Sequence, residues 1–365
     1  MGKLLTILLC VLLTAGCAQK KIIDDLALIN AVGYDKTNNK EEPLKVTVTF
    51  PMISKDGQYD RKTITVYGKS SKEAKGKVRY QTNLLLESGQ LRVALFGSEL
   101  AKEGLVPYVD TIVRDPSIGS RVMLALGKNE ANDILTLQIN NEGQNATYLE
   151  QFITKLNIES RAVHYNIHQF LRDYYDDGID PVMPVFKVEK KNIAFDGVGL
   201  FQGDKLKKIL NTSDTNILFL LRKKVKHGNI GLEIETKEEK KAHIMLSYVQ
   251  TTHRIKVKME KDKPVVTIYL KVVGDILEYM GKDDLTDPKI KKEAENSISD
   301  ELNKQGEEMI KQLQGLQVDP LGVGGYVRNK MNYKEWKEID WYDLYKDMNI
   351  GLKMEVKINS SGKWK

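Results

Sequence analysis

The sequence has 365 residues, 41% of them apolar, and a formal net charge of +6 from 56 Lys and Arg against 50 Asp and Glu. One hydrophobic core rarely spans such a length, so we expect two or three domains. The basic residues are spread along the chain without a block that aromatic residues interrupt, which argues against a nucleic-acid partner. After Cys17 no segment reaches about 18 consecutive apolar residues, so the chain alone is not expected to form a membrane-spanning pore or transporter.

The N-terminus has the pattern of a secretory signal peptide. Lys3 precedes an apolar run over residues 4–14, and the small residues Ala15 and Gly16 follow this run. A stretch of about eleven residues is too short to cross a bilayer, which takes roughly 20. We therefore predict that residues 1–16 are a signal peptide and are removed after export.

The end of this segment predicts a lipoprotein. Residues 13–17 resemble a lipobox, in which cleavage between Gly16 and Cys17 leaves a cysteine that carries diacylglycerol and palmitate, although Thr14 stands where Leu is usual. The alternative is an ordinary signal peptide that contains Cys17 by chance. Two acyl chains anchor a protein stably to a membrane. Residues 17–21 would then be a lipidated tether that holds the folded body within roughly 20 Å of the bilayer.

Residues 22–190 are predicted to form an N-terminal region of two subdomains, one of them an α/β unit over about 60–135. Ser70 and Glu73 have the spacing of a capping box and begin a helix. The expected strands are 46–50, 63–67, 91–96 and 121–126. The expected helices are 70–86, one from Ser98 as N-cap to a break at Gly104, one with Pro107 in its first turn, 147–157 and 162–174.

Residues 191–365 are predicted to form a C-terminal α+β domain. Apolar residues alternate with lysines, which indicates an antiparallel sheet with one side in water. Asp287 and Pro288 begin a long helix over about 287–316. Its apolar stripe is expected to pack on the sheet face or on a partner helix, and the sheet face is preferred. The expected strands are 193–201, 242–249, 255–259, 266–272 and 350–358. The chain as a whole is therefore predicted to be α+β.

The residue patterns give no support for an enzyme. His164 and His168 lie four residues apart on an expected helix and could face one metal, but no third ligand is near, so solvated or core histidines are the preferred interpretation. The spacings of phosphate-binding and dinucleotide-binding loops are incomplete, and no Gly-x-Ser-x-Gly elbow occurs. Cys10 leaves with the signal peptide and Cys17 carries lipid, so no cysteine remains for catalysis or for a disulfide. We expect no catalytic residue, no metal and no cofactor apart from the covalent lipid.

Four aromatic residues lie close together before the last expected strand. They are Trp336, Trp341, Tyr342 and Tyr345. Aromatic residues are enriched at protein interfaces and are also common in cores. Both interpretations stay open, and the core is preferred.

Several short segments follow the lipobox in a characteristic order. They are residues 22–26, 33–35, 88–101, 104–105, 114–116, 197–201, 204–206 and 319–324, followed by Trp336 and Trp341. In this order the chain resembles the Ger(x)C lipoproteins, the C subunits of nutrient germinant receptors in endospore-forming bacteria. The resemblance covers nearly the whole mature chain.

The resemblance implies a non-catalytic α+β protein of three compact domains with mixed or antiparallel sheets. It implies a lipid anchor on the outer face of the spore inner membrane, and contact with two integral membrane subunits, A and B, that supports nutrient-triggered germination. Within the matching segments, we expect Arg114, Asp115, Asp319, Trp336 and Trp341 to be interface or family-motif positions.

Two other functions remain to be weighed. The first is a lipid-anchored solute-binding protein that delivers a small molecule to a permease. Such proteins usually have two similar α/β lobes joined by hinges, whereas the second half of this chain has an antiparallel pattern. The second is a surface hydrolase, which is the least supported because no catalytic constellation is present.

Overall fold

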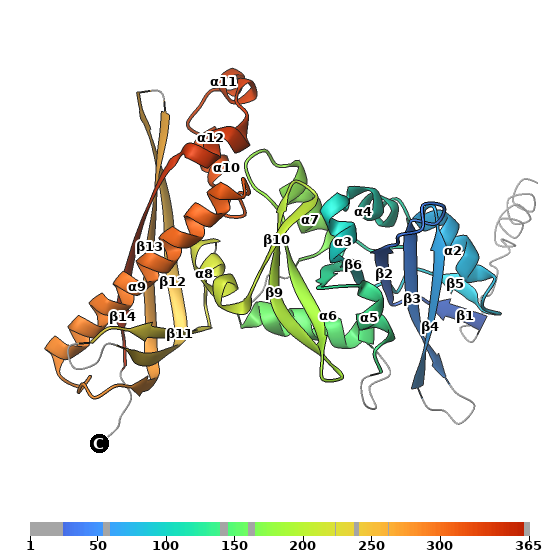
Figure 1. The fold of residues 1–365 in the computed structure, drawn as a ribbon, viewed down its shortest axis with the longest axis horizontal. Coiled ribbons are helices and arrows are strands. Elements are labelled where there is room, and N and C mark those ends of the chain that lie inside the picture. The colour runs from blue at the N-terminus through green and yellow to red at the C-terminus, as the bar shows by residue number, and fades with distance from the viewer. Residues whose placement is uncertain are drawn as a thin grey trace, which may run out of the picture.

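The computed structural model describes residues 25–53, 59–138, 145–159, 165–222, 224–236, 241–261 and 263–360 (Figure 1). The predicted signal peptide, residues 1–16, and the predicted tether, residues 17–21, lie outside these ranges. The described strands form three sheets, which have two, eight and four strands. Helices pack between and against these sheets, so the predicted α+β class is confirmed. Among the described residues, no helix combines the length and the apolar character that crossing a bilayer requires.

The largest sheet, which we call the central sheet, has eight strands in the order β10-β9-β8-β7-β6-β2-β3-β4. Its strands are β2 (Ala31–Lys36), β3 (Leu44–Ile53), β4 (Tyr59–Gly68), β6 (Val93–Gly97), β7 (Met123–Gly127), β8 (Val182–Glu189), β9 (Asn192–Gln202) and β10 (Lys205–Leu210). The central strands β2, β6, β7 and β8 are parallel neighbours, and the strands toward either edge are antiparallel. Every residue of β6 and β7 is buried, as expected for parallel strands covered on both faces. A separate parallel pair joins β1 (Leu26–Leu28) to β5 (Leu85–Glu87).

Short helices cover this sheet. They are α2 (Ser71–Arg79), α3 (Ser98–Glu103), α4 (Val106–Val113), α5 (Ala131–Thr136), α6 (Asn145–Ile158) and α7 (Ile167–Tyr175). Ser70 is the N-cap of α2, and its side chain accepts a hydrogen bond from the Glu73 amide as predicted. The helix expected to reach residue 86 ends at Arg79 instead. The N-cap of α3 is Gly97, so Ser98 is its first residue.

The central sheet continues past the expected domain boundary at 190/191. Strand β8 ends at Glu189 and β9 begins at Asn192, and the two are antiparallel neighbours joined by a tight turn. The turn residues Lys190 and Lys191 both have positive φ angles. Strands β9 and β10 therefore belong to the same sheet as β2, β3, β4, β6, β7 and β8. The chain leaves this sheet through α8 (Thr212–Arg222), a helix that was not predicted from the sequence.

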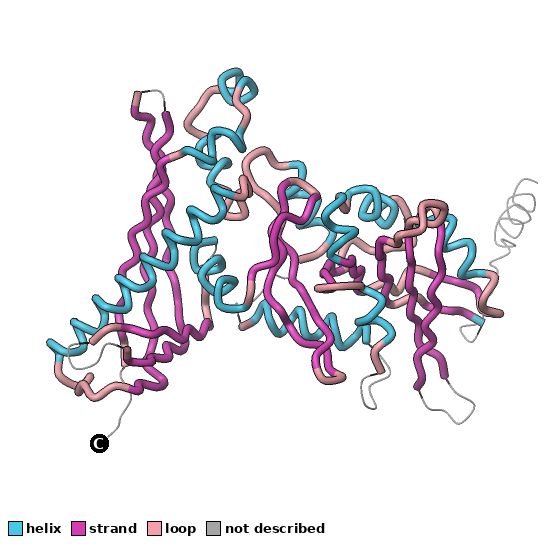
Figure 2. Tube along the Cα trace, in the orientation of Figure 1, coloured by secondary structure: helices cyan, strands magenta, loops and turns pink. Residues whose placement is uncertain are grey.

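The C-terminal sheet has the order β11-β12-β13-β14. Its strands are β11 (Gly228–Ile234), β12 (Ala242–Glu260), β13 (Lys263–Met280) and β14 (Asn349–Ile358). Strands β11 to β13 are antiparallel as expected, but β14 runs parallel to β13, so the prediction of an antiparallel C-terminal sheet is wrong for this last strand and the sheet is mixed. A parallel neighbour requires a crossover connection, and the long helix α9 (Pro288–Gly315) belongs to it. The β12–β13 hairpin extends well past the end of β11 (Figure 2).

The long helix α9 runs along one face of this sheet (Figure 1). Asp287 caps its N-terminus through hydrogen bonds from the amides of Lys289 and Ile290. Gly306 lies directly over Leu352 and Met354 of β14, which brings the helix close to the strand. The predicted packing of the helix on the sheet is confirmed. Three short helices complete the crossover: α10 (Val323–Arg328), α11 (Tyr333–Glu338) and α12 (Trp341–Asp347).

Candidate functional site

A buried polar junction joins the central sheet to the C-terminal domain, and it contains the predicted motif residue Asp319. The segments before β8 and after α9 meet here, although they are far apart in the chain. The Asp180 amide donates to the Asp319 carbonyl oxygen at 2.8 Å. In return, the Asp319 amide donates to Oδ2 of Asp180 at 2.7 Å. The two aspartates thus form a reciprocal pair, and both are buried.

The Asp319 carboxylate points at the beginning of α10. Its Oδ1 accepts from the Val323 amide at 3.1 Å, and its Oδ2 accepts from the Gly324 amide at 2.8 Å. These amides are orphan donors of the first helical turn, so the side chain completes the hydrogen bonding of the helix. Burial raises the pKa of Asp319 to about 7. This residue therefore acts inside the junction, and its side chain is not exposed to a partner.

Asp180 links three elements. Its Oδ1 accepts from the Gly203 amide and from the Tyr342 hydroxyl, each at 2.8 Å, and its Oδ2 accepts from the amide of Asp319. Burial raises the pKa of Asp180 despite these hydrogen bonds. Because the acceptor atoms are engaged by groups of the chain itself, the arrangement is suited to holding segments together. Asp180 was not predicted as a site residue, since its segment has the composition of an ordinary loop.

The backbone itself approaches closely at the junction. The Gly325 amide donates to the Gly178 carbonyl oxygen at 3.1 Å, and a Cβ on Gly324 would lie 2.4 Å from the Gly178 Cα. Only glycine fits at such a contact. Two ion pairs reinforce it from outside: Arg328 with Asp176 at 2.6 Å, and Lys337 with Asp177 at 2.8 Å.

The aromatic cluster packs against the same junction. The ring centroids of Trp336 and Trp341 are 5.5 Å apart, and those of Trp341 and Tyr345 are 5.4 Å apart. Trp336 and Tyr345 are buried, as the preferred core interpretation predicted. Trp341 is half-buried, and no hydrogen-bond partner for its Nε1 occurs among the described residues. Trp336, Trp341 and Tyr342 line a cavity of about 290 Å³ together with Asp177 and Asp180.

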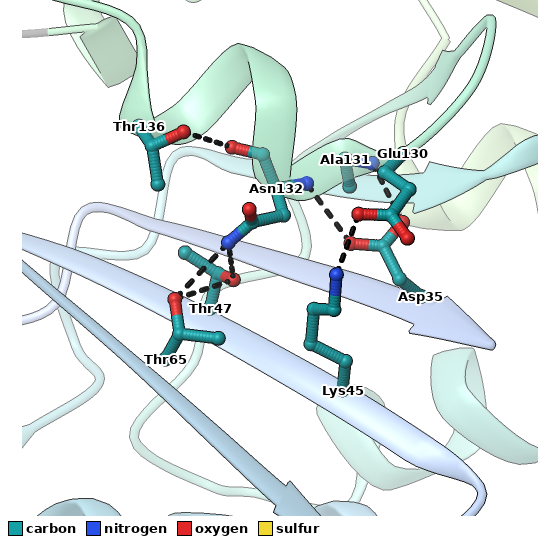
Figure 3. Close-up of polar contacts among 8 residues, drawn as sticks. All are labelled: Asp35, Lys45, Thr47, Thr65, Glu130, Ala131, Asn132 and Thr136. Carbon is teal, nitrogen blue, oxygen red and sulfur yellow. Dashed lines mark hydrogen bonds and ion pairs between the residues drawn. The ribbon is translucent and has the colours of Figure 1, made fainter. Parts of the chain in front are cut away.

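A second buried carboxylate, Asp35, lies in the central sheet (Figure 3). It follows Gly33 and Tyr34 in β2, a segment that carries part of the family resemblance. Its Oδ1 accepts from the Ala131 amide at 2.6 Å and its Oδ2 accepts from the Asn132 amide at 2.9 Å, so it binds the first turn of α5. Burial raises the pKa of Asp35 to about 6.

Neighbouring side chains extend this contact across the sheet. The Asn132 Nδ2 donates to Oγ1 of Thr47 at 2.8 Å and to Oγ1 of Thr65 at 3.0 Å (Figure 3). Lys45 pairs with Glu130, the N-cap of α5, at 2.5 Å. The cluster therefore attaches α5 to strands β2, β3 and β4 through polar groups.

The predicted positions Arg114 and Asp115 lie at the end of α4. Arg114 is exposed, and its Nε donates to Oδ2 of Asp110 at 2.6 Å. Asp115 accepts from Ser117 and Lys75, and these hydrogen bonds lower its pKa to about 2. Both residues line a mostly apolar cavity of about 310 Å³ between α2, α4 and the sheet. Their assignment to an interface stays a prediction.

The remaining predicted residues fall in different places. Gly16, Cys17 and His164 lie outside the described ranges, so the lipid site and the histidine pair stay untested. His168 is described and exposed, on α7. Within the described part of the chain, no group of three His, Cys, Asp or Glu side chains is arranged to hold a metal ion.

Comparison with known proteins gives concordant matches along the chain. A family model described as a spore germination protein N-terminal domain matches residues 19–188, and one described as spore germination B3/GerAC-like, C-terminal, matches residues 196–362. The spore germination protein GerQC of Bacillus cereus is 25% identical over 95% of both chains. The spore germination protein KC of Bacillus subtilis is 24% identical over 97% of this chain and 94% of its own length. The crystal structure of the GerBC protein superposes with a TM-score of 0.55 at 18% identity, and the match covers 91% of this chain and 98% of that one.

Proposed function

Because the chain belongs to the Ger(x)C family of spore germination proteins, we propose that it is the C subunit of a nutrient germinant receptor. In this role it is a non-catalytic protein, anchored by lipid on the outer face of the spore inner membrane. It acts by contact with the integral membrane A and B subunits. The observation that carries the proposal is the succession of the two family models, which together extend from residue 19 to residue 362 in the expected order.

The chemistry of the buried carboxylates supports a role without a catalytic step. Asp35, Asp180 and Asp319 are buried, and each accepts hydrogen bonds from at least two groups of the chain itself. Groups engaged in this way organise the backbone. A body with fixed connections between its elements is suited to presenting a surface to membrane-embedded neighbours.

The solute-binding alternative has less support. Proteins of that class have two similar lobes, whereas this chain has an eight-stranded mixed sheet and a smaller four-stranded sheet of different topology. The hydrogen-bonded junction at Asp180 and Asp319 also joins the two parts through buried contacts. A hinge that opens and closes around a solute would have to break them.

The predicted lipid anchor lets the proposal be tested at one residue, Cys17. We expect Cys17→Ala to move the protein from the membrane fraction to the soluble fraction of spores and to weaken nutrient-triggered germination, because two acyl chains supply the stable attachment. Cys10→Ala is the matched control, since Cys10 lies in the predicted signal peptide; this variant should stay on the membrane. Mass spectrometry of the native N-terminal peptide checks the lipid directly, and affinity purification from spore membranes should recover the A and B subunits.

Two results would contradict the proposal. One is an unmodified N-terminus on native protein that remains in the aqueous fraction. The other is full germination by the Cys17→Ala variant while it is soluble and separate from the A and B subunits.

A further inference from the structure

One face of the C-terminal sheet is strongly basic. Helix α9 covers the other face, where Leu352 and Met354 of β14 point. Side chains at the alternate positions of β12, β13 and β14 point away from the helix, because successive residues of a strand face opposite sides. We call this side the basic face and define it by the exposed residues Arg254, Lys256, Lys258, Lys271, Lys353 and Lys357.

The strand register places these cations beside one another. Arg254 of β12 is opposite Tyr269 of β13, which in turn is opposite Lys353 of β14, so the three form one row across the sheet. The Nζ atom of Lys256 lies 5.1 Å from the centre of the Tyr269 ring, and the Nζ atom of Lys353 lies 5.9 Å from it. A single aromatic ring thus has cations from two different strands against it.

The charges of the basic face are only partly offset by acidic residues of the described part of the chain. Among the described residues, none of the six cations forms an ion pair within 4.0 Å. Glu260 and Glu355 occupy positions on the same side, which leaves the face positive in sum. A cluster of like charges raises the free energy of the isolated fold and attracts anions. The chemistry therefore fits a partner that presents many negative groups over an open surface.

We propose that the basic face binds the anionic headgroups of a phospholipid bilayer. Five of its six cations are lysines, whose compact, hydrated ammonium groups act as point charges and suit mobile headgroups better than one fixed carboxylate. Each Lys or Arg near an anionic membrane strengthens binding about fivefold. The inference rests on the proposed function in one respect, because the lipid anchor is what brings the body to a bilayer.

The arrangement of the chain gives this contact a structural consequence. The described N-terminal end, beside β1, and the C-terminal sheet lie at opposite ends of the long axis (Figure 1). An anchor at one end and the basic face at the other would attach the molecule to the membrane at two separated points. The long axis would then lie along the bilayer, and the central sheet would be held beside the membrane.

The test uses the mature chain from residue 17 with Cys17→Ser, so that no lipid contributes and the signal peptide is absent. Co-sedimentation is measured with vesicles of phosphatidylcholine alone and with phosphatidylglycerol added. We expect binding only to the mixed vesicles, with a loss as salt increases, since screening weakens charge attraction. Lys256→Gln together with Lys353→Gln should weaken binding roughly 30-fold.

The matched control is Lys207→Gln together with Lys208→Gln, two exposed lysines of β10 in the central sheet. This variant has the same net charge, so it should bind almost as well as the parent; an equal loss in both variants would overturn the assignment to this face. Absence of binding to mixed vesicles at low salt would also overturn it, as would binding of soluble polyglutamate in place of vesicles, which would identify an acidic polypeptide as the partner. Because the tested chain has no lipid, its result is independent of whether native Cys17 is acylated.

Discussion

Asp35 illustrates how a single carboxylate can position a helix. Its two oxygens accept from successive amides, Ala131 and Asn132, in the first turn of α5. Carboxylates at this end of a helix are favoured because the free amides carry partial positive charge. Gly97 leaves the room for this contact, since a Cβ there would meet the Asp35 carboxylate.

We predict that Asp35→Asn lowers the free energy of unfolding by about 1–3 kcal/mol at neutral pH. The amide group of Asn can accept only with its oxygen, so one backbone N–H of α5 would face a second donor. Urea unfolding followed by circular dichroism measures the effect. The control is Asp133→Asn, which changes an exposed carboxylate in the same helix and should stay within about 0.5 kcal/mol of the wild type.

The pH dependence of this difference tests the cause. Burial raises the pKa of Asp35 from 3.8 to about 6, so the native state holds the proton more tightly than the unfolded chain. The stability that this tighter proton binding by Asp35 contributes is complete below the pKa of the unfolded chain and is lost as the pH rises through the native pKa. Asn does not titrate, so the gap between the wild type and the variant should narrow from about pH 4 to about pH 7. A gap that widens over this range would show that the carboxylate is stabilised in its charged form.

The candidate site could be predicted only in part at the scale of residues. Asp319 and Trp336 were both singled out from their segments. Burial was predicted for Trp336 but not for Asp319. Its partner Asp180 is 139 residues away in the chain, and a local pattern contains no information about such a pairing. Asp180 lies in a segment rich in Asp, Gly and Pro that has the composition of a solvated turn.

Among the elements, the C-terminal strands show what periodicity can and cannot predict. Alternation identified the strands of the hairpin, but the polar run at 250–254 suggested a break where β12 is continuous. Ladder hydrogen bonds to β13 continue through this run, with register shifts at Met245/Leu246 and Ser247/Gln250. The direction of β14 could not be predicted, because an alternating pattern is the same for a parallel and an antiparallel neighbour.

The contact between α9 and β14 gives a prediction for this pair of elements. Gly306→Leu should destabilise the protein by about 1–3 kcal/mol, because a Cβ at this position would lie 2.4 Å from Leu352 and 2.7 Å from Met354. Thermal unfolding measures the loss. Gly315→Leu is the control: its Cβ would have no atom within 4 Å, and the residue is exposed near the end of the same helix. Leu favours a helix more than Gly does, so Gly315→Leu should not lower stability; equal losses in both variants would mean that the contact with β14 does not determine the effect.

For the molecule as a whole, the boundary between the two family models and the boundary between the central and C-terminal sheets lie at different points in the chain. The two family models meet between residues 188 and 196, close to the expected boundary at 190/191. The central sheet nevertheless continues through β9 and β10 to Leu210. Strand pairing across that point gives a physical reason for the two halves to fold together. The segments around Asp180 and Asp319 supply a second connection between them.

The connection around Asp180 and Asp319 can be tested by comparing substitutions at two neighbouring glycines, because a Cβ on Gly324 would lie against Gly178 and a Cβ on Gly325 would not. We predict that Gly324→Ala destabilises the protein by about 2 kcal/mol or more, because its Cβ would lie 2.4 Å from the Gly178 Cα and 2.9 Å from the Gly178 oxygen, both backbone atoms that cannot turn aside. Gly325→Ala is the matched control: no atom lies within 4 Å of its Cβ, so added helix propensity should leave stability unchanged or slightly higher. Hydrogen exchange should show faster opening of α10 and of the segment around Gly178, which precedes β8, only in the first variant. If both variants exchange like the wild type, the junction does not couple the central sheet to the C-terminal domain.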